Sequence, residues 1–136
     1  MDSKQVIPIN SEESILMARV QVRGYIDYYG LNFSPLERMH ILTATSELAR
    51  NIYMYAKTGA VTLEHIKEPR PGLKVVFADQ GPGIPNLEEA MKPKPVSKYS
   101  NGMGLGLSGS KRLADEFHIT TQPGKGTVIT FIKWEK

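Results

Sequence analysis

The 136-residue sequence predicts one α+β domain in which helices cover one face of a mostly antiparallel sheet. Segments typical of strands and helices follow one another in the order strand, two helices, two strands, loop, helix and two strands. No internal repeat or linker divides the chain. Its length suffices for one hydrophobic core but is too short for two comfortable ones. We therefore treat residues 1–136 as a single domain.

The first two elements are expected at 4–9 and 11–29. Residues 4–9 alternate weakly between polar and apolar and include Pro8, which is typical of an edge strand. Ser11 is expected to cap the first helix, and Gly30 to stop it. The apolar residues of this helix are Ile15, Leu16, Val20, Val22 and Ile26.

The second helix has the clearest start signal in the sequence. Ser34 is a capping residue, Pro35 occupies the first helical position and Glu37 the third, which is the capping-box arrangement. Gly59 is expected to close the segment about seven turns later. At about 100° per residue, one side of this helix forms a core face of Ile41, Thr45, Leu48, Ala49, Ile52 and Ala56.

A separate stripe of the second helix carries polar side chains. It consists of His40, Ala44, Glu47, Asn51 and Tyr55. Glu47 and Asn51 are one turn apart and point the same way, and the small Ala44 is expected to leave space beside them. Taken alone, a Glu and an Asn on a helix are typical of a solvated face. Motifs elsewhere in the chain favour a functional interpretation of this pair.

The second half of the chain is expected to complete the sheet. Two strands, 60–66 and 73–78, are joined by a turn with the sequence KEPRPG. A Pro-, Lys- and Ser-rich stretch without a clear period follows. A helix from about 105 to 117 then leads into a closing hairpin made of 118–122 and 127–134.

Composition excludes several classes of protein. With no cysteine, the chain has no disulfide scaffold, thiolate metal site or cysteine nucleophile, which is typical of a reducing compartment. The N-terminal residues show no signal-peptide pattern, and no apolar run approaches the length of a membrane span. The formal net charge is only +3, with basic residues scattered among acidic ones. We expect a cytoplasmic protein with no nucleic-acid and no membrane partner.

The segment NGMGLGLSGS, at 101–110, has four glycines, at 102, 104, 106 and 109, that run into a predicted helix. Glycines let backbone N–H groups approach a ligand closely, and a helix N-terminus adds partial positive charge, which favours phosphate binding. The alternative is a flexible loop whose glycines only allow a tight entry into the helix. This segment lacks the preceding strand and the later acidic residue that a dinucleotide-binding fingerprint requires, and the P-loop pattern GxxxxGK[ST] is absent. Both the dinucleotide-binding fold and the P-loop fold are therefore rejected.

Four short motifs occur in order: ELARN at 47–51, DQGPG at 79–83, GMGLGL at 102–107 and GKGT at 124–127. They resemble the N, G1, G2 and G3 boxes of the GHKL superfamily, the ATP-binding domains shared by gyrase, Hsp90, histidine kinases and MutL. TSELARNIYMYA, ADQGPGIP, GLGLSGSKRLADEF and PGKGT resemble the stressosome switch kinases of bacterial stress signalling. The resemblance covers nearly the whole chain. It implies a Bergerat-type ATP-binding sandwich with three helices on one face of the sheet.

The resemblance implies an adenine site around Asp79. This carboxylate, at the end of an apolar strand, would accept a hydrogen bond from the exocyclic amine of adenine. Gly81 and Gly83 would keep the wall beside the base free of side chains, and Thr127 would contribute its hydroxyl by way of water. The alternative interpretation of Asp79 is an Asx-type turn residue that ends the strand.

The resemblance also implies a phosphate site and a base. The residues that would bind the phosphates of ATP are Gly102, Gly104, Leu105 and Gly106. Residues 92–101 would act as a lid. Asn51 would supply an oxygen to Mg²⁺, which prefers hard oxygen ligands. Glu47 is placed to accept a proton as a general base.

An ATP- and Mg²⁺-dependent serine/threonine protein kinase is the function that the resemblance implies. It would act in trans on STAS-domain scaffold or antagonist proteins of the stressosome, and on release bind and activate a PP2C-type phosphatase through its regulatory domain. No histidine has the surroundings of a histidine-kinase acceptor. Two alternatives remain open: an anti-sigma-factor serine kinase that sequesters a sigma subunit, and a nucleotide-gated binding module without kinase activity.

Overall fold

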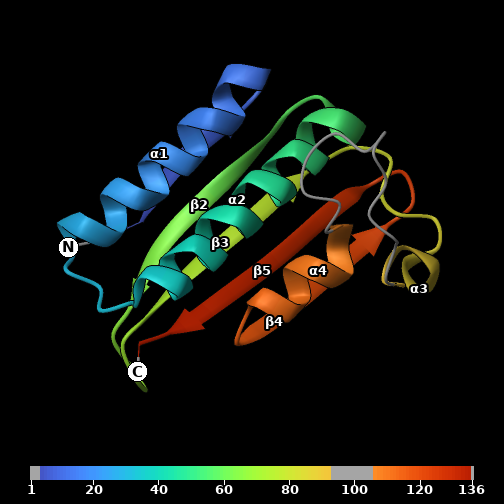
Figure 1. Cartoon of the computed structure of the whole chain (residues 1–136). Helices are drawn as coiled ribbons and strands as arrows, with labels where there is room; N and C mark the ends of the chain where they lie inside the picture. Colours follow the sequence, from blue (N-terminus) through green and yellow to red (C-terminus); the bar gives the residue numbers. More distant parts are fainter. Residues whose placement is uncertain (1–3, 93–105, 136) are drawn as a thin grey trace.

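Five strands form one sheet in the computed structural model, which describes residues 4–92 and 106–135 (Figure 1). They are β1 (Gln5–Ile9), β2 (Gly59–Ile66), β3 (Gly72–Asp79), β4 (Glu116–Gln122) and β5 (Gly126–Trp134). The spatial order is β1-β2-β3-β5-β4, and all neighbouring strands run antiparallel. The prediction of a mostly antiparallel sheet with β1 at its edge is confirmed.

Helices within the described residues cover one face of this sheet (Figure 1). They are α1 (Glu12–Tyr28), α2 (Pro35–Ala56) and α4 (Gly106–Leu113). A further single-turn helix, α3 (Leu87–Ala90), was not expected and follows the loop after β3. None of the described helices combines the length and the apolar character that crossing a membrane requires.

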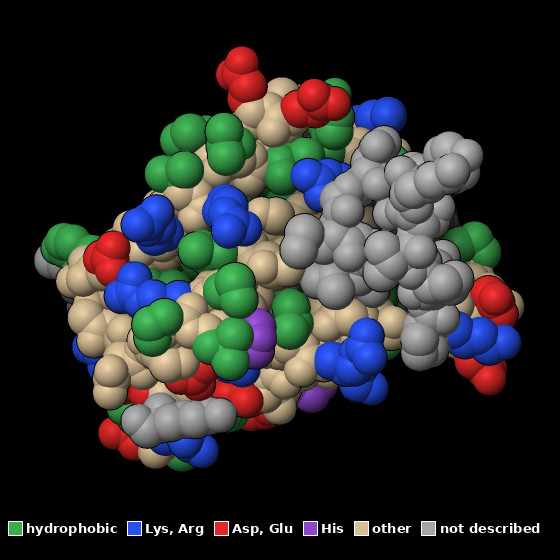
Figure 2. Space-filling model, in the orientation of Figure 1, with side chains coloured by type: hydrophobic (Ala, Val, Ile, Leu, Met, Phe, Trp, Pro, Cys, Tyr) green, Lys and Arg blue, Asp and Glu red, His purple; other side chains and the backbone are tan. Residues whose placement is uncertain are grey.

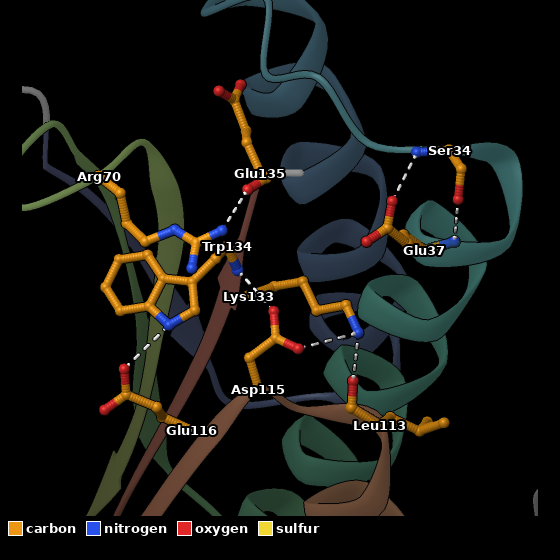
Figure 3. Close-up of polar contacts among 9 residues, drawn as sticks. All are labelled: Ser34, Glu37, Arg70, Leu113, Asp115, Glu116, Lys133, Trp134 and Glu135. Atoms are coloured by element: carbon orange, nitrogen blue, oxygen red, sulfur yellow. Dashed lines mark hydrogen bonds and ion pairs between the residues drawn. The ribbon is translucent and has the colours of Figure 1, made fainter.

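The capping box at the start of α2 is present in full. The Glu37 backbone N–H donates to Ser34 Oγ at 3.1 Å, and the Ser34 N–H donates to Glu37 Oε1 at 3.0 Å (Figure 3). At the other end the prediction was wrong, because the helix stops at Ala56 and Lys57 adopts φ +70°. Gly59 instead opens β2, where a Cβ would lie 2.5 Å from the Ala78 carbonyl oxygen.

We expect Ser34→Ala to lower the free energy of unfolding by about 1 kcal/mol, because the first turn of α2 loses its side-chain acceptor. Urea denaturation of the purified protein measures this difference. Thr43→Ala is the matched control, since it removes a hydroxyl from the same helix that forms no hydrogen bond with the described residues. Equal losses in the two variants would contradict a specific capping role.

The predicted core face of α2 is largely confirmed. Ile41, Thr45, Leu48, Ala49 and Ile52 are buried, while Ala56 is partly exposed. Ala44 is only 1% exposed, so it packs into the core and does not leave space beside Glu47 as expected. Ala44 borders the core stripe, and its methyl group is small enough to fit between the helix and its neighbours.

Two apolar residues of α1 do not join the core. Leu16 is 62% exposed and Val20 is 52% exposed, although the sequence analysis counted both among the apolar residues of this helix. The buried stripe of this helix consists of Ile15, Ala18, Val22, Tyr25 and Ile26. These positions recur with the helical period of about 3.6 residues and share one side of the helix. Leu16 and Val20 lie on a different side, which is why they fall outside the stripe.

Helix α4 ends four residues before the predicted end at 117. The chain leaves the helix because the Asp115 N–H donates to the Ile132 carbonyl at 2.9 Å and Phe117 pairs with Phe131 in the hairpin. Lys133, only 6% exposed, donates from Nζ to the Leu113 carbonyl at 3.0 Å (Figure 3). A buried cation thus donates a hydrogen bond to a carbonyl in the last turn of α4, where a positive charge also interacts favourably with the helix dipole.

Candidate active site

A cavity of about 390 Å³ lies between α2, the adjoining ends of β3 and β5, and the start of α4. Its apolar lining includes Leu48, Ile52, Phe77, Ile84, Leu107 and Ile129. Phe77 and Ile129 are cross-strand partners, so together they form a continuous apolar surface. Polar side chains on the same cavity are those of Asn51, Tyr55, Asp79, Lys92 and Thr127. An apolar pocket with a few polar groups is typical of a small-ligand site.

Asp79 is the last residue of β3 and lies between Gly59 of β2 and Thr127 of β5. The Gly81 N–H donates to Asp79 Oδ1 at 2.9 Å, which is the Asx-type turn. No described residue donates to the other oxygen, Oδ2. The two interpretations of Asp79 are therefore compatible, because one carboxylate oxygen holds the turn and the other is available to a ligand.

The glycines after Asp79 allow the loop to pack closely against its neighbours. A Cβ on Gly81 would lie 2.5 Å from the Cβ of Ala56 on α2. Gly83 has φ +78°, and a Cβ there would overlap the Gln122 carbonyl. Gly83 lines the cavity, whereas Gly81 is not among the described residues that do. Their contribution to an adenine site stays a prediction.

Gly126 directly precedes the cavity residue Thr127, and the sequence analysis gave it no role although the GKGT motif contains it. Its φ is +113°, and a Cβ would overlap the Asp79 carbonyl oxygen. The absence of a side chain therefore lets the start of β5 approach the end of β3. This contact joins two segments that are far apart in sequence, so no local pattern could reveal it.

We expect Gly126→Ala to lower the free energy of unfolding by about 1–3 kcal/mol, because the variant combines an unfavourable φ with a backbone clash. Gly24→Ala is the control. Gly24 lies within α1, and a Cβ added there would meet no atom within 4 Å, so alanine should raise stability by roughly 0.5–1 kcal/mol. Chemical denaturation of both variants tests the pair, and a stable Gly126→Ala protein would contradict it.

Thr127 is only 7% exposed and belongs to a small hydroxyl network. Its Oγ1 lies 2.9 Å from Thr121 Oγ1, and the Ile84 N–H donates to the same Thr121 oxygen at 2.9 Å. The network ties the β4–β5 hairpin to the loop that follows Asp79. Thr121 was missed from the sequence, although the hairpin register, which pairs it with Thr127, could have indicated it.

Glu47 and Asn51 lie one turn apart on α2, as predicted. Asn51 lines the cavity, while Glu47 is not among its described lining residues. The Glu47 side chain is 12% exposed, and its Oε2 is buried without a hydrogen bond to any described residue. Arg50 Nη1 lies 3.9 Å from this oxygen. A buried acceptor without a hydrogen-bond donor costs about 1–3 kcal/mol, and the role of Glu47 as a general base stays a prediction.

The N-terminus of α4 closes the cavity within the described residues. Gly106 lines the cavity and has φ +60°. Gly102, Gly104 and Leu105, together with most of the expected lid, lie outside the described residues, so their roles stay predictions. Lys92 lines the cavity as well and forms an ion pair with Glu89 at 3.1 Å.

Residues 37–136 match the family of histidine kinase-, DNA gyrase B- and HSP90-like ATPases. Because this match covers most of the chain, the protein belongs to that family. Over nearly its whole length the chain is also similar to the serine/threonine-protein kinase RsbT of Bacillus subtilis (strain 168). The two are 40% identical over 135 residues, which cover 98% of each protein. The resemblance seen in the four sequence motifs is confirmed.

Two further similarities are more distant. The anti-sigma F factor of Thermoanaerobacter sp. (strain X514) is 29% identical over 97 residues, covering 69% of this chain and 68% of that protein. The solved structure of the RsbU and RsbW domains of Rv1364c from Mycobacterium tuberculosis aligns with a TM-score of 0.67 at 18% identity. The alignment covers 97% of this chain but only 32% of that one, and it supports the fold alone.

Proposed function

We propose that this chain is an ATP-dependent serine/threonine protein kinase that acts on a separate protein. The observation that carries the proposal is the buried Oε2 of Glu47, which accepts no hydrogen bond from the described residues and lies one turn before Asn51 at the cavity. A domain that only binds nucleotide has no need of a carboxylate base at this position. The 40% identity with RsbT over 98% of the chain supports the same function.

ATP would lie with its base at Asp79. Its Oδ2, to which no described residue donates, would accept a hydrogen bond from the adenine amine, while the apolar surface of Phe77 and Ile129 would contact the base. Asn51 and Gly106 line the same cavity, so they lie on the route that the phosphates take. Backbone N–H groups at the start of α4 favour negative charge there.

Glu47 would act as the general base. The oxygen of the acceptor Ser or Thr attacks the γ-phosphorus, the bond from phosphorus to the β–γ bridging oxygen breaks, and ADP leaves with the bonding electrons. Glu47 takes the proton from the acceptor hydroxyl. The side-chain oxygen of Asn51 fits Mg²⁺, a hard cation, which when bound neutralises charge on the phosphate oxygens.

The partners we propose are STAS-domain scaffold or antagonist proteins of the stressosome, followed by the regulatory domain of a PP2C-type phosphatase. Phosphorylation of the first partner would release the kinase to bind and activate the second, in a cytoplasmic stress response. The similarity to RsbT over the full length supports this assignment. An anti-sigma-factor kinase is a second candidate, supported by the weaker and shorter similarity to anti-sigma F factors.

The first test is the intact mass of a STAS-domain protein encoded beside this gene, after incubation with the chain and Mg-ATP. The expected result is the mass of one added phosphate, which is absent without ATP or with EDTA. A chain that binds nucleotide but transfers no phosphate would be better described as a nucleotide-gated binding module. Tight binding of a sigma subunit would instead favour the anti-sigma-factor function.

A further inference from the structure

Hydrophobic side chains lie exposed on the outer surface of the two N-terminal helices. Leu16 and Val20 of α1 are 62% and 52% exposed, and Met54 of α2 is 48% exposed. Figure 2 shows hydrophobic and basic side chains side by side over much of α1 and α2, and acidic side chains near the two ends of α1. These residues are not part of the buried core of the domain. An exposed apolar cluster of this kind is typical of an interaction surface.

A groove of about 490 Å³ runs between the start of α1 and the end of α2 within this surface. We call it the α1/α2 groove. It is lined by Glu12, Ile15 and Leu16 of α1, by Ser46, Arg50, Tyr53 and Met54 of α2, and by Lys57. Leu16 and Met54 give it an apolar part that a hydrophobic side chain of another molecule can contact.

Two of the three charged residues that line the α1/α2 groove in the described structure are cations. Arg50 and Lys57 line it, and Arg19 donates to the lining hydroxyl of Ser46 at 3.3 Å. Glu12 is the only acidic residue among the described lining. Complementary potentials speed encounter and select partners, so this groove favours a segment with carboxylates around a hydrophobic side chain.

The groove adjoins the candidate catalytic base. Arg50 lines the groove, and its Nη1 lies 3.9 Å from Glu47 Oε2. Ser46, another lining residue, directly precedes Glu47 in α2. A protein held in the groove therefore lies next to the group that would take the proton from its hydroxyl.

We propose that the α1/α2 groove is the docking site of the phosphoacceptor protein, which inserts a hydrophobic side chain flanked by acidic residues. This inference rests on the proposed kinase function, because it names the substrate surface for the same site. A second copy of the chain fits the groove less well. A symmetric contact would bring the cations of both copies, Arg19, Arg50 and Lys57, against one another.

The test is the affinity of the STAS-domain protein, measured by titration calorimetry with Leu16→Glu and Arg19→Glu. Each variant should weaken binding about tenfold, since it adds negative charge to the groove. Leu36→Glu is the matched control, because Leu36 is also an exposed leucine, at 56%, but lies at the opposite end of α2 outside the groove. It should bind within about twofold of the wild type. The affinity for ATP should be unchanged in all variants.

The outcomes separate docking from chemistry. Equal binding by the wild type and both groove variants would overturn the docking site, even if phosphate transfer is normal. If both groove variants lose binding and the wild type transfers no phosphate, the docking site is kept and the kinase function is rejected. A wild-type dimer that Leu16→Glu converts to a monomer in light scattering would overturn the inference, because the groove would then belong to a second copy.

Discussion

Glu47→Gln is expected to lower the rate of phosphate transfer by about 10²–10⁴-fold while ATP affinity changes little. The amide has nearly the same shape as the carboxylate but cannot take the proton from the acceptor hydroxyl. Its oxygen can still lie near Arg50, so the fold of α2 should be preserved. Intact-mass time courses give the rate, and equilibrium titration with a fluorescent ATP analogue gives the affinity.

The control for this variant is Glu64→Gln, which makes the same chemical change on β2, away from the cavity lining. Its rate should match the wild type. If Glu47→Gln retains more than about a tenth of the wild-type rate, Glu47 is not the base. A loss of ATP affinity comparable to the loss of rate would instead place Glu47 in nucleotide binding.

Asp79→Asn is expected to weaken ATP binding by about 10- to 100-fold. In the wild type the Gly81 N–H donates to Asp79 Oδ1 at 2.9 Å. In the variant the same N–H would hold the amide oxygen in that position. The amide NH₂ would then face the adenine amine, so two donors would oppose each other. Guanine carries an acceptor at the same position, so the preference for ATP over GTP should fall as well.

Parallel titrations with fluorescent ATP and GTP analogues measure both effects of Asp79→Asn. Asp27→Asn is the control, since it alters an exposed carboxylate of α1 that pairs with Arg38 at 2.7 Å. It should leave both affinities unchanged. Unaltered nucleotide preference in Asp79→Asn would show that Asp79 only holds the turn.

The elements that the sequence predicted well depend on short-range chemistry. The capping box of Ser34 and Glu37 involves neighbours within one turn, and the strands show alternation over a few residues. The end of α4 was not predictable in this way. It is set by hydrogen bonds from Asp115 and Lys133 to residues distant in the sequence, which replace the hydrogen bonds that a longer helix would form.

The candidate site shows the same division. The motifs containing Asn51, Asp79 and Thr127 could be found one by one, but only packing of α2 on the sheet brings them to one cavity. The close approach of Gly126 to Asp79, like the hydroxyl contact of Thr121, depends on strand register. The exposure of Leu16 was hidden because apolar residues of a helix are usually assigned to the core.

The two edges of the sheet bear on how the protein avoids aggregation. Proline in β1 supplies no N–H to an added strand, so Pro8 makes this edge a poor template for sheet extension. At the opposite edge, the exposed residues of β4 are the polar Glu116, His118, Thr120 and Gln122. Intermolecular strand pairing is thus opposed at both borders, so the protein can expose apolar groups on its helices without its sheet polymerising.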